Sequence, residues 1–248
     1  MTSYESPEQA ALATVRDAQP WPGGDERFTG YGVMGLPFDS GHYLAFRHYV
    51  ATTVGPAYRT VWHRAPDGTW SFYSGVEPET SCPRYFAAST ATRTVRADVD
   101  VTWDGPFALR ITIPDVLEWR LTLASTPATA TMSAIGSRLP VAAWRSQAFL
   151  KTMEHTARPL MRTGRIGLCG TVPNGQRFGL APRLLWAVTG SGARLGGADL
   201  GSPRALDRQD RLGDFWLPQR GLFAIGDAEF ETFDPDRHRT LVSGGSHA

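Results

Sequence analysis

The sequence predicts a mainly β protein in which two antiparallel β meanders, or half-barrels, are joined by a central helical pair. Two observations favour this class: apolar residues recur at every second position along much of the chain, and turn-forming tripeptides separate the alternating stretches. A third is one stretch of helical periodicity between two β-rich halves. With 248 residues, of which 42% are hydrophobic and 20% charged, the chain can bury a sizeable core.

Residues 1–25 are expected to form an N-terminal helix or a loose arm. Small and apolar residues from Ala10 to Val15 allow one short amphipathic helix, which Pro20 and Pro22 stop. The segment lacks the basic start and apolar stretch of a secretory signal, and no apolar run approaches the roughly 20 residues that cross a bilayer. Two cysteines without a CxxC pattern are typical of reduced thiols. We therefore expect a cytoplasmic protein with no transmembrane segment.

A first β domain is expected over residues 26–124. Apolar and polar residues alternate most regularly in its last third, which predicts an antiparallel meander with one wet and one dry face. Upstream, the Pro-Asp-Gly turn at 66–68 is a hairpin signal. The expected strands of this domain are 43–50, 58–64, 69–74, 95–103, 107–113 and 117–123.

Residues 125–163 are expected to form the helical pair. Pro127 suits the first turn of one helix, after a serine or threonine that can cap it. A second helix with a broad apolar stripe is expected at 141–158, where Pro159 and a later glycine end it.

A second β domain is expected over residues 164–233, followed by a flexible tail at 234–248. Pro173-Asn174-Gly175 repeats the hairpin chemistry of the first domain. The expected strands of this domain are 165–171, 176–181, 184–188, 193–195, 221–225 and 228–233.

Charge and motif content exclude several functions. Lys+Arg number 25 against 24 Asp+Glu, a formal net charge of +1, which argues against a nucleic-acid partner because such a partner needs a surplus of positive charge. The sequence contains no HExxH, no cysteine or histidine cluster at metal-ligand spacing, and no phosphate-binding GxxxxGK[ST] motif. We therefore expect no metal and no cofactor.

Lys151 is the sole lysine of the chain, which prompts the hypothesis of a Schiff-base amine. Such an amine needs a depressed pKa, through burial or a neighbouring cation. Glu154 and His155 follow at helical spacing, and this pattern favours an exposed, protonated lysine instead.

The segment from Glu77 to Phe86 combines two carboxylates, a thiol, a guanidinium and a phenol, and it follows a strongly aromatic strand. If this segment crosses the mouth of a barrel, one acid would lie in an apolar pocket, where burial raises its pKa enough for proton donation. In the alternative interpretation, Arg84 pairs with Glu77 or Glu79 and the segment is a structural corner.

Two histidines and one aromatic cluster complete the candidates. His48 and His63 lie on apolar strand faces, where a histidine serves as a base or as a core residue with satisfied hydrogen bonds. Asp214 precedes Phe215 and Trp216, an arrangement that suits a ligand pocket or plain packing. The predicted catalytic residues are Glu77, Glu79, Tyr85, His63 and Asp214. The predicted ligand-binding residues are His48, Trp62, Trp70, Phe72, Arg84, Phe86, Phe215 and Trp216.

The two β-rich halves, the Trp62-His63-Arg64 strand that enters a Pro-Asp-Gly hairpin, and the abundant aromatic residues resemble the two-domain lipocalin-like proteins. That group includes carotenoid hydratase-like proteins and natural-product cyclases. The resemblance covers most of the chain in architecture and rests on no diagnostic motif. It implies a polyene, terpenoid or polyketide held in a cavity where a carboxylic acid or tyrosine assists proton transfer. No catalytic residue carries over, because no motif matches position by position.

Three functions follow from these observations. The first is a cofactor-free acid–base enzyme (a hydratase, isomerase or cyclase) that acts on a hydrophobic small molecule, with aromatic walls that stabilise positive charge. The second is a non-catalytic carrier of such a ligand. The third is a structural or interaction protein, which a cavity smaller than the roughly 300 Å³ of a ligand site would favour. The sequence is also compatible with a homodimer.

Overall fold

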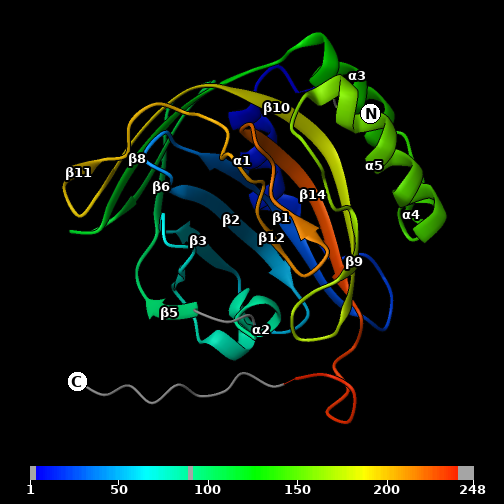
Figure 1. Cartoon of the computed structure of the whole chain (residues 1–248). Coiled ribbons are helices and arrows are strands. Elements are labelled where there is room, and N and C mark those ends of the chain that lie inside the picture. Colours follow the sequence, from blue (N-terminus) through cyan, green and yellow to red (C-terminus); the bar gives the residue numbers. More distant parts are fainter. Residues whose placement is uncertain (1–3, 89–91, 240–248) are drawn as a thin grey trace.

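One curled, largely antiparallel sheet contains most of the strands (Figure 1). The computed structural model describes residues 4–88 and 92–239. Ten strands follow one another in the order β5-β4-β3-β2-β1-β14-β10-β8-β7-β6, and the short strands β9 and β11 each pair with β10. Among the described strands only β4 and β5 pair in parallel. The predicted mainly β class, with half-barrel curvature and antiparallel pairing, is confirmed.

The strands have the following bounds. One half of the path contains β5 (Thr92–Arg96), β4 (Trp70–Ser74), β3 (Tyr58–Arg64), β2 (Tyr43–Thr52) and β1 (Glu26–Pro37). The other half contains β14 (Leu222–Phe230), β10 (Arg177–Leu195), β8 (Leu117–Ala124), β7 (Ala108–Ile113) and β6 (Asp100–Gly105). The short strands are β9 (Cys169–Thr171), β11 (Ala198–Asp199), and the separate pair β12 (Arg211–Leu212) and β13 (Phe215–Trp216).

The helices begin at local capping signals. Ser6 accepts a hydrogen bond from the backbone of α1, and Thr126 forms a capping box with Thr129 at the start of α3. None of the helices in the described ranges is long and apolar enough to cross a membrane. The helices are α1 (Pro7–Asp17), α2 (Pro83–Phe86), α3 (Pro127–Gly136), α4 (Val141–Trp144), α5 (Gln147–Met161) and the 3₁₀ turn η1 (Pro78–Thr80).

The helix expected at 141–158 is two helices. The chain breaks after α4 because Ser146 has an extended backbone and its side chain caps a new helix, α5. The expected stop at Pro159 is wrong: α5 continues through Pro159 to Met161 and ends where Arg162 adopts a left-handed backbone with φ 52°. Pro159 lacks one backbone hydrogen-bond donor. Because it lies in the last turn of α5, the missing hydrogen bond does not end the helix at that residue.

Strand β1 lies at the centre of the sheet, between β2 and β14, and its residues are not among the strands expected from the sequence. Its glycines interrupt the alternation that indicates a strand. They are required because the neighbouring backbone approaches closely: a Cβ on Gly30 would overlap the carbonyl oxygen of His48 on β2, and one on Gly32 would overlap that of Phe46. The glycines of β1 are therefore explained by contacts with strand β2, and the alternation pattern within residues 26–37 does not reveal the strand.

The strand expected at 95–103 is also wrong, because it is two strands at opposite ends of the sheet. β5 ends at Arg96 beside β4, and β6 begins at Asp100 beside β7. Val99, between them, is 5% exposed, so the apolar alternation continues across the break and hides it. Conversely, the strands expected at 176–181, 184–188 and 193–195 are one strand, β10.

The sheet carries an apolar core on each face. Along β2, Tyr43 and Ala45 belong to one core, whereas Leu44 and Phe46 belong to the other, as expected where successive side chains alternate. The first core contains aromatic residues of β3, β4 and α2, namely Tyr58, Trp62, Trp70, Phe72, Tyr85 and Phe86, together with residues of α4 and α5. The second contains residues of α1 and of β6, β7 and β8.

The expected domains share this sheet, since β14 and β10 pair with β1 and β8 respectively. In the expected tail, His238 is 5% exposed and its ring accepts a hydrogen bond from the backbone nitrogen of Asp234 (2.9 Å). Arg237 pairs with Glu231 at 2.9 Å. Residues 240–248 of that tail lie outside the described residues.

Candidate functional site

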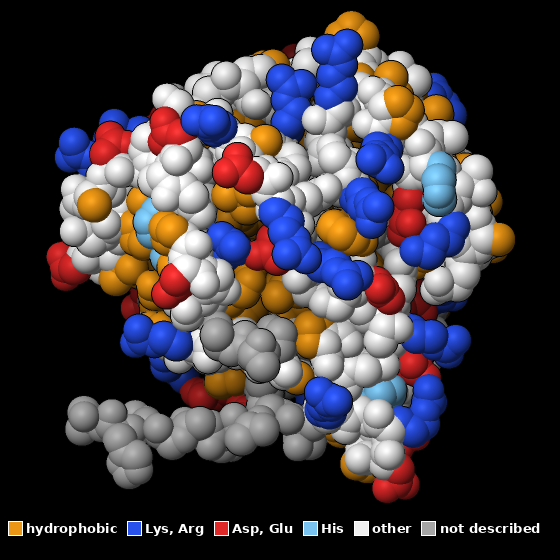
Figure 2. Space-filling model, in the orientation of Figure 1, with side chains coloured by type: hydrophobic (Ala, Val, Ile, Leu, Met, Phe, Trp, Pro, Cys, Tyr) orange, Lys and Arg blue, Asp and Glu red, His pale blue; other side chains and the backbone are white. Residues whose placement is uncertain are grey.

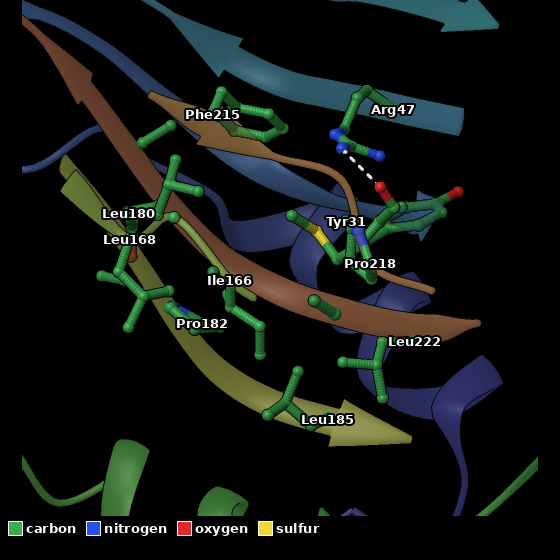
Figure 3. Close-up of a pocket in the computed structure, with 18 of the residues that line it drawn as sticks. Tyr31, Arg47, Ile166, Leu168, Leu180, Pro182, Leu185, Phe215, Pro218 and Leu222 are labelled. Carbon is green, nitrogen blue, oxygen red and sulfur yellow. Dashed lines mark hydrogen bonds between the residues drawn. The ribbon is translucent and has the colours of Figure 1, made fainter. Parts of the chain in front are cut away.

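A cavity of about 110 Å³ lies between the sheet and the helical segment (Figure 3). Small residues on three adjacent strands leave space on this face, among them Gly30 on β1, Ala181 on β10, and Ala224 and Gly226 on β14. A side chain at Gly226 is excluded because a Cβ there would overlap the carbonyl oxygen of Ala181. The unfilled volume is therefore a consequence of how closely the central strands approach one another.

The helices close the cavity from the other side. Met153, Ala157 and Met161 recur on one side of α5 at spacings of four residues, and all three line the cavity. Glu154, between them, holds α5 to the strand below. Its Oε1 accepts hydrogen bonds from the backbone nitrogens of Leu168 (2.8 Å) and Cys169 (3.1 Å).

The remaining walls are mostly aromatic and aliphatic. Figure 2, which has the orientation of Figure 1, shows hydrophobic side chains in the middle of the visible surface, with basic and acidic side chains around them. The further apolar lining residues are Met34, Trp62, Phe86, Met132, Trp144, Ile166, Leu168, Leu180, Pro182, Leu185, Phe215, Trp216, Pro218, Leu222, Ala228 and Phe230.

Arg47 is the one cationic side chain among the described lining residues, and it is only 5% exposed. Its Nη1 donates to the carbonyl oxygens of Val33 and Phe46, and its Nη2 donates to that of Met34 (3.1 Å). The guanidinium carbon lies 5.0 Å from the ring centroid of Trp62, within the range of a cation–π contact. Figure 3 shows Arg47 among the apolar side chains of the pocket.

Three further ionisable side chains belong to lining residues, namely Tyr31, Tyr49 and Asp227. Burial raises the pKa of Tyr49 well above its ordinary value, against the smaller opposing effect of Arg47, so the phenol stays protonated. Burial also raises the pKa of Asp227, although Arg183 at 2.9 Å and the hydroxyl of Thr29 at 2.6 Å oppose the shift. The Asp227 carboxylate therefore already has a cationic partner.

The predicted aromatic ligand-binding residues divide between the cavity and the core. Trp62 and Phe86 line the cavity, as do Phe215 and Trp216. Trp70 and Phe72 are buried in the same apolar core but do not line the cavity.

The predicted acids lie elsewhere. Glu77 and Glu79 are exposed, and Glu77 pairs with Arg96 at the sheet edge. Asp214 is exposed, and its Oδ2 accepts a hydrogen bond from the backbone nitrogen of Thr171 (2.9 Å). None of these three acids is among the residues that line the cavity.

Tyr85 and Arg84 belong to a buried polar network around Glu26, not to the cavity. Arg84 pairs with Glu26 at 2.7 Å, whereas the structural-corner interpretation expected Glu77 or Glu79 as its partner. The Tyr85 hydroxyl donates to the same carboxylate at 2.5 Å. Burial alone would raise the pKa of Glu26. The hydrogen bonds from Arg84, Tyr85 and Gln176 together lower this pKa by more than burial raises it, so the net pKa lies below the ordinary value. The segment is a corner tied to the start of β1.

The two predicted histidines each have a side-chain partner. Nε2 of His63 lies 2.8 Å from Nδ1 of His42, with the rings nearly parallel, and burial lowers the pKa of His63 to about 4. Nδ1 of His48 lies 2.9 Å from the hydroxyl of Tyr31. Burial lowers the pKa of His48 to about 4 and raises that of Tyr31 to about 12. His48 lines a separate, polar groove with a volume of about 460 Å³ that also contains Arg59.

Lys151 has the surroundings of an ordinary surface lysine. Its side chain is 52% exposed and pairs with Glu154 at 3.0 Å. Partial burial lowers its pKa, but the hydrogen bond and charge of Glu154 raise it more, so the net pKa shift is upward. That direction is opposite to the one a Schiff-base amine needs. In the described ranges, no group of three or more His, Cys, Asp and Glu residues is arranged to hold a metal ion.

Sequence reasoning missed Arg47 and Asp227, the two charged residues that line the cavity. Arg47 did leave a signal, because it is a charged residue in a strand whose two faces are both partly apolar. Asp227 lies between small residues of β14 and left no comparable signal.

Comparison with known proteins does not place the chain in a family. No protein-family model matches it, and neither does any curated protein. Among solved structures, it is similar to acetoacetate decarboxylase from Legionella pneumophila subsp. pneumophila str. Philadelphia 1, with a TM-score of 0.38 and 10% sequence identity over 97% of each chain. A likeness at this level supports no conclusion about function, so the functional argument rests on the cavity itself.

Proposed function

We propose that the protein binds a compact, largely apolar small molecule in the cavity between α5 and the sheet. The observation that carries this proposal is a set of apolar walls from separate elements around a small number of polar groups, the usual composition of a ligand pocket. Trp62, Trp144 and Trp216 supply flat aromatic surface from β3, α4 and β13. Ligand and walls would pack by dispersion and by removal of apolar surface from water.

The volume of the cavity defines the size of the ligand. About 110 Å³ lies below the roughly 300 Å³ of a site for a drug-sized molecule, which by itself favours the structural alternative and leaves no room for a polyene in this conformation. An apolar cavity of roughly 150 Å³ nevertheless binds benzene in another protein. The proposed ligand is accordingly of benzene size, or slightly larger if α5 moves outward.

A second candidate is the acid–base enzyme, and Asp227 is the specific observation that favours it. Asp227 is the one carboxylate among the described lining residues, and its raised pKa brings it closer to the range in which an acid exchanges protons near neutral pH. In this version, hydration or isomerisation of the bound molecule needs no cofactor. Loss of turnover, but not of binding, in Asp227→Asn would support the enzyme. Equal turnover would exclude Asp227 as the acid, and binding without any turnover by the native protein would leave the carrier.

The binding proposal is tested by filling the cavity. Ala224→Leu adds three carbon atoms to the cavity floor, and Ala198→Leu adds them at an exposed position of the short strand β11 as a matched control. Compact aromatic and aliphatic probes of about six to ten non-hydrogen atoms are titrated while tryptophan fluorescence is recorded. We expect binding to the native protein and the control, and at least tenfold weaker binding to Ala224→Leu. Equal binding to all three, or no binding to any, contradicts the proposal.

A further inference from the structure

The guanidinium of Arg47 has hydrogen bonds but no counter-charge. No carboxylate forms an ion pair with it anywhere in residues 4–88 and 92–239. Three of its N–H bonds are used by backbone carbonyls. The side chain of Tyr49 is a further hydrogen-bond partner of Arg47, and it is a neutral phenol that supplies no charge.

A buried cation without a counter-charge is costly, because its attraction to backbone dipoles recovers only part of its lost hydration. The same arrangement holds the guanidinium in a fixed position. The carbonyls of Val33, Phe46 and Met34 hold one side of it, and the ring of Trp62 covers a face. Such a group is preorganised to receive an anion, because a charge-assisted hydrogen bond in an apolar site is strong and the present partners of Arg47 are all neutral.

The other charged lining residue does not serve as that anion. Asp227 lies on β14, and its carboxylate is engaged by Arg183 at 2.9 Å and by Thr29 at 2.6 Å. The positive charge of Arg47 is therefore left for a molecule that enters the cavity.

We propose that Arg47 binds the carboxylate of the ligand, so that the cavity selects compact monocarboxylic acids with an apolar body. This inference rests on the proposed function and specifies the ligand class for that site. A single carboxylate fits better than a phosphate, because the described lining offers one cationic side chain and the rest of the wall is almost entirely apolar. The apolar body of the acid would face the methionine side chains of α5.

The test compares each acid with its own primary amide, which has nearly the same size and shape but no charge. Isobutyrate, hexanoate and benzoate are titrated against the native protein at pH 7, together with isobutyramide, hexanamide and benzamide, with tryptophan fluorescence as the readout. We expect at least one acid to bind tenfold or more tightly than its amide. Equal affinities for acid and amide overturn the carboxylate assignment but leave the proposed function standing, whereas no binding by any of the six contradicts both.

Variants then assign the preference to Arg47. Arg47→Gln removes the charge and retains a donor for the carbonyls, and Arg47→Lys retains the charge without the planar fork. Arg110→Gln, on the exposed β6–β7 hairpin, controls for net charge. We expect Arg47→Gln to bind acid and amide equally, and Arg110→Gln to keep the native ratio. An unchanged ratio in folded Arg47→Gln would refute the assignment. If that variant does not fold, Arg47→Met, which also lacks the charge, is compared in the same way, and an unchanged ratio there would refute the assignment. Arg47→Lys should keep part of the preference for the acid because it keeps the charge.

Discussion

Stability should decrease in mild acid because His63 is held neutral in the folded protein. Its environment consists of His42 on one side and Asp67 nearby, and burial is the main cause of its depressed pKa. The folded pKa is about 4 against 6.5 for an unperturbed histidine. Between these pH values only the unfolded chain takes up the proton. The contribution of neutral His63 to the free energy of unfolding is therefore complete above pH 6.5 and is lost as the pH falls toward 4.

The size of the effect follows from this shift. Between pH 7 and pH 5, one such histidine lowers the free energy of unfolding by about 2 kcal/mol. His48 has the same depressed pKa and contributes a similar loss independently. His63→Gln cannot take up a proton at all, so the variant should lose about 2 kcal/mol less than the native protein over this interval.

Urea unfolding at 25 °C, followed by tryptophan fluorescence at pH 7, 6 and 5, measures this difference. The comparison uses the slope with pH, so a constant destabilisation by the substitution does not affect it. His155→Gln, at an exposed position on α5, is the control and should retain the native slope. If His63→Gln loses as much stability between pH 7 and pH 5 as the native protein does, His63 is not neutral in the folded state and the reasoning fails.

Two further predictions concern the framework around the cavity. Gly30→Ala should lower the free energy of unfolding by about 3 kcal/mol, because the added methyl group overlaps the next strand, whereas Gly192→Ala, with open space around it, should change it by no more than about 1 kcal/mol. Glu26→Ala should cost about 3 kcal/mol in urea unfolding because it leaves Arg84 partly buried without its partner, whereas Glu77→Ala at the exposed edge should cost less than about 1 kcal/mol. Equal effects within either pair would contradict the corresponding argument.

The fold class was predictable because its signals are local. Alternating residues and the two hairpin turns appear in short stretches of sequence, and both hairpins form: the backbone nitrogen of Gly68 donates to Ala65, and that of Gly175 to Val172. The central strand β1 was not predictable in this way, since its glycines reflect contact with strands distant in sequence. The cavity was only partly predictable for the same reason. Its aromatic residues could be guessed, but Arg47 and the residues of α5 come to line one cavity only in the folded chain.

The position of β14 has a consequence for synthesis on the ribosome. Among the strands of the described sheet this one emerges last, yet it pairs with β1 on one side and with β10 on the other, at the centre of the sheet. Until residues 222–230 leave the exit tunnel, the nascent chain has two separate partial sheets, each with a long unpaired edge. Such edges associate readily with other chains. A chain that ends before β14 is therefore expected to accumulate in inclusion bodies, and chaperone engagement should persist until residues 222–230 have emerged.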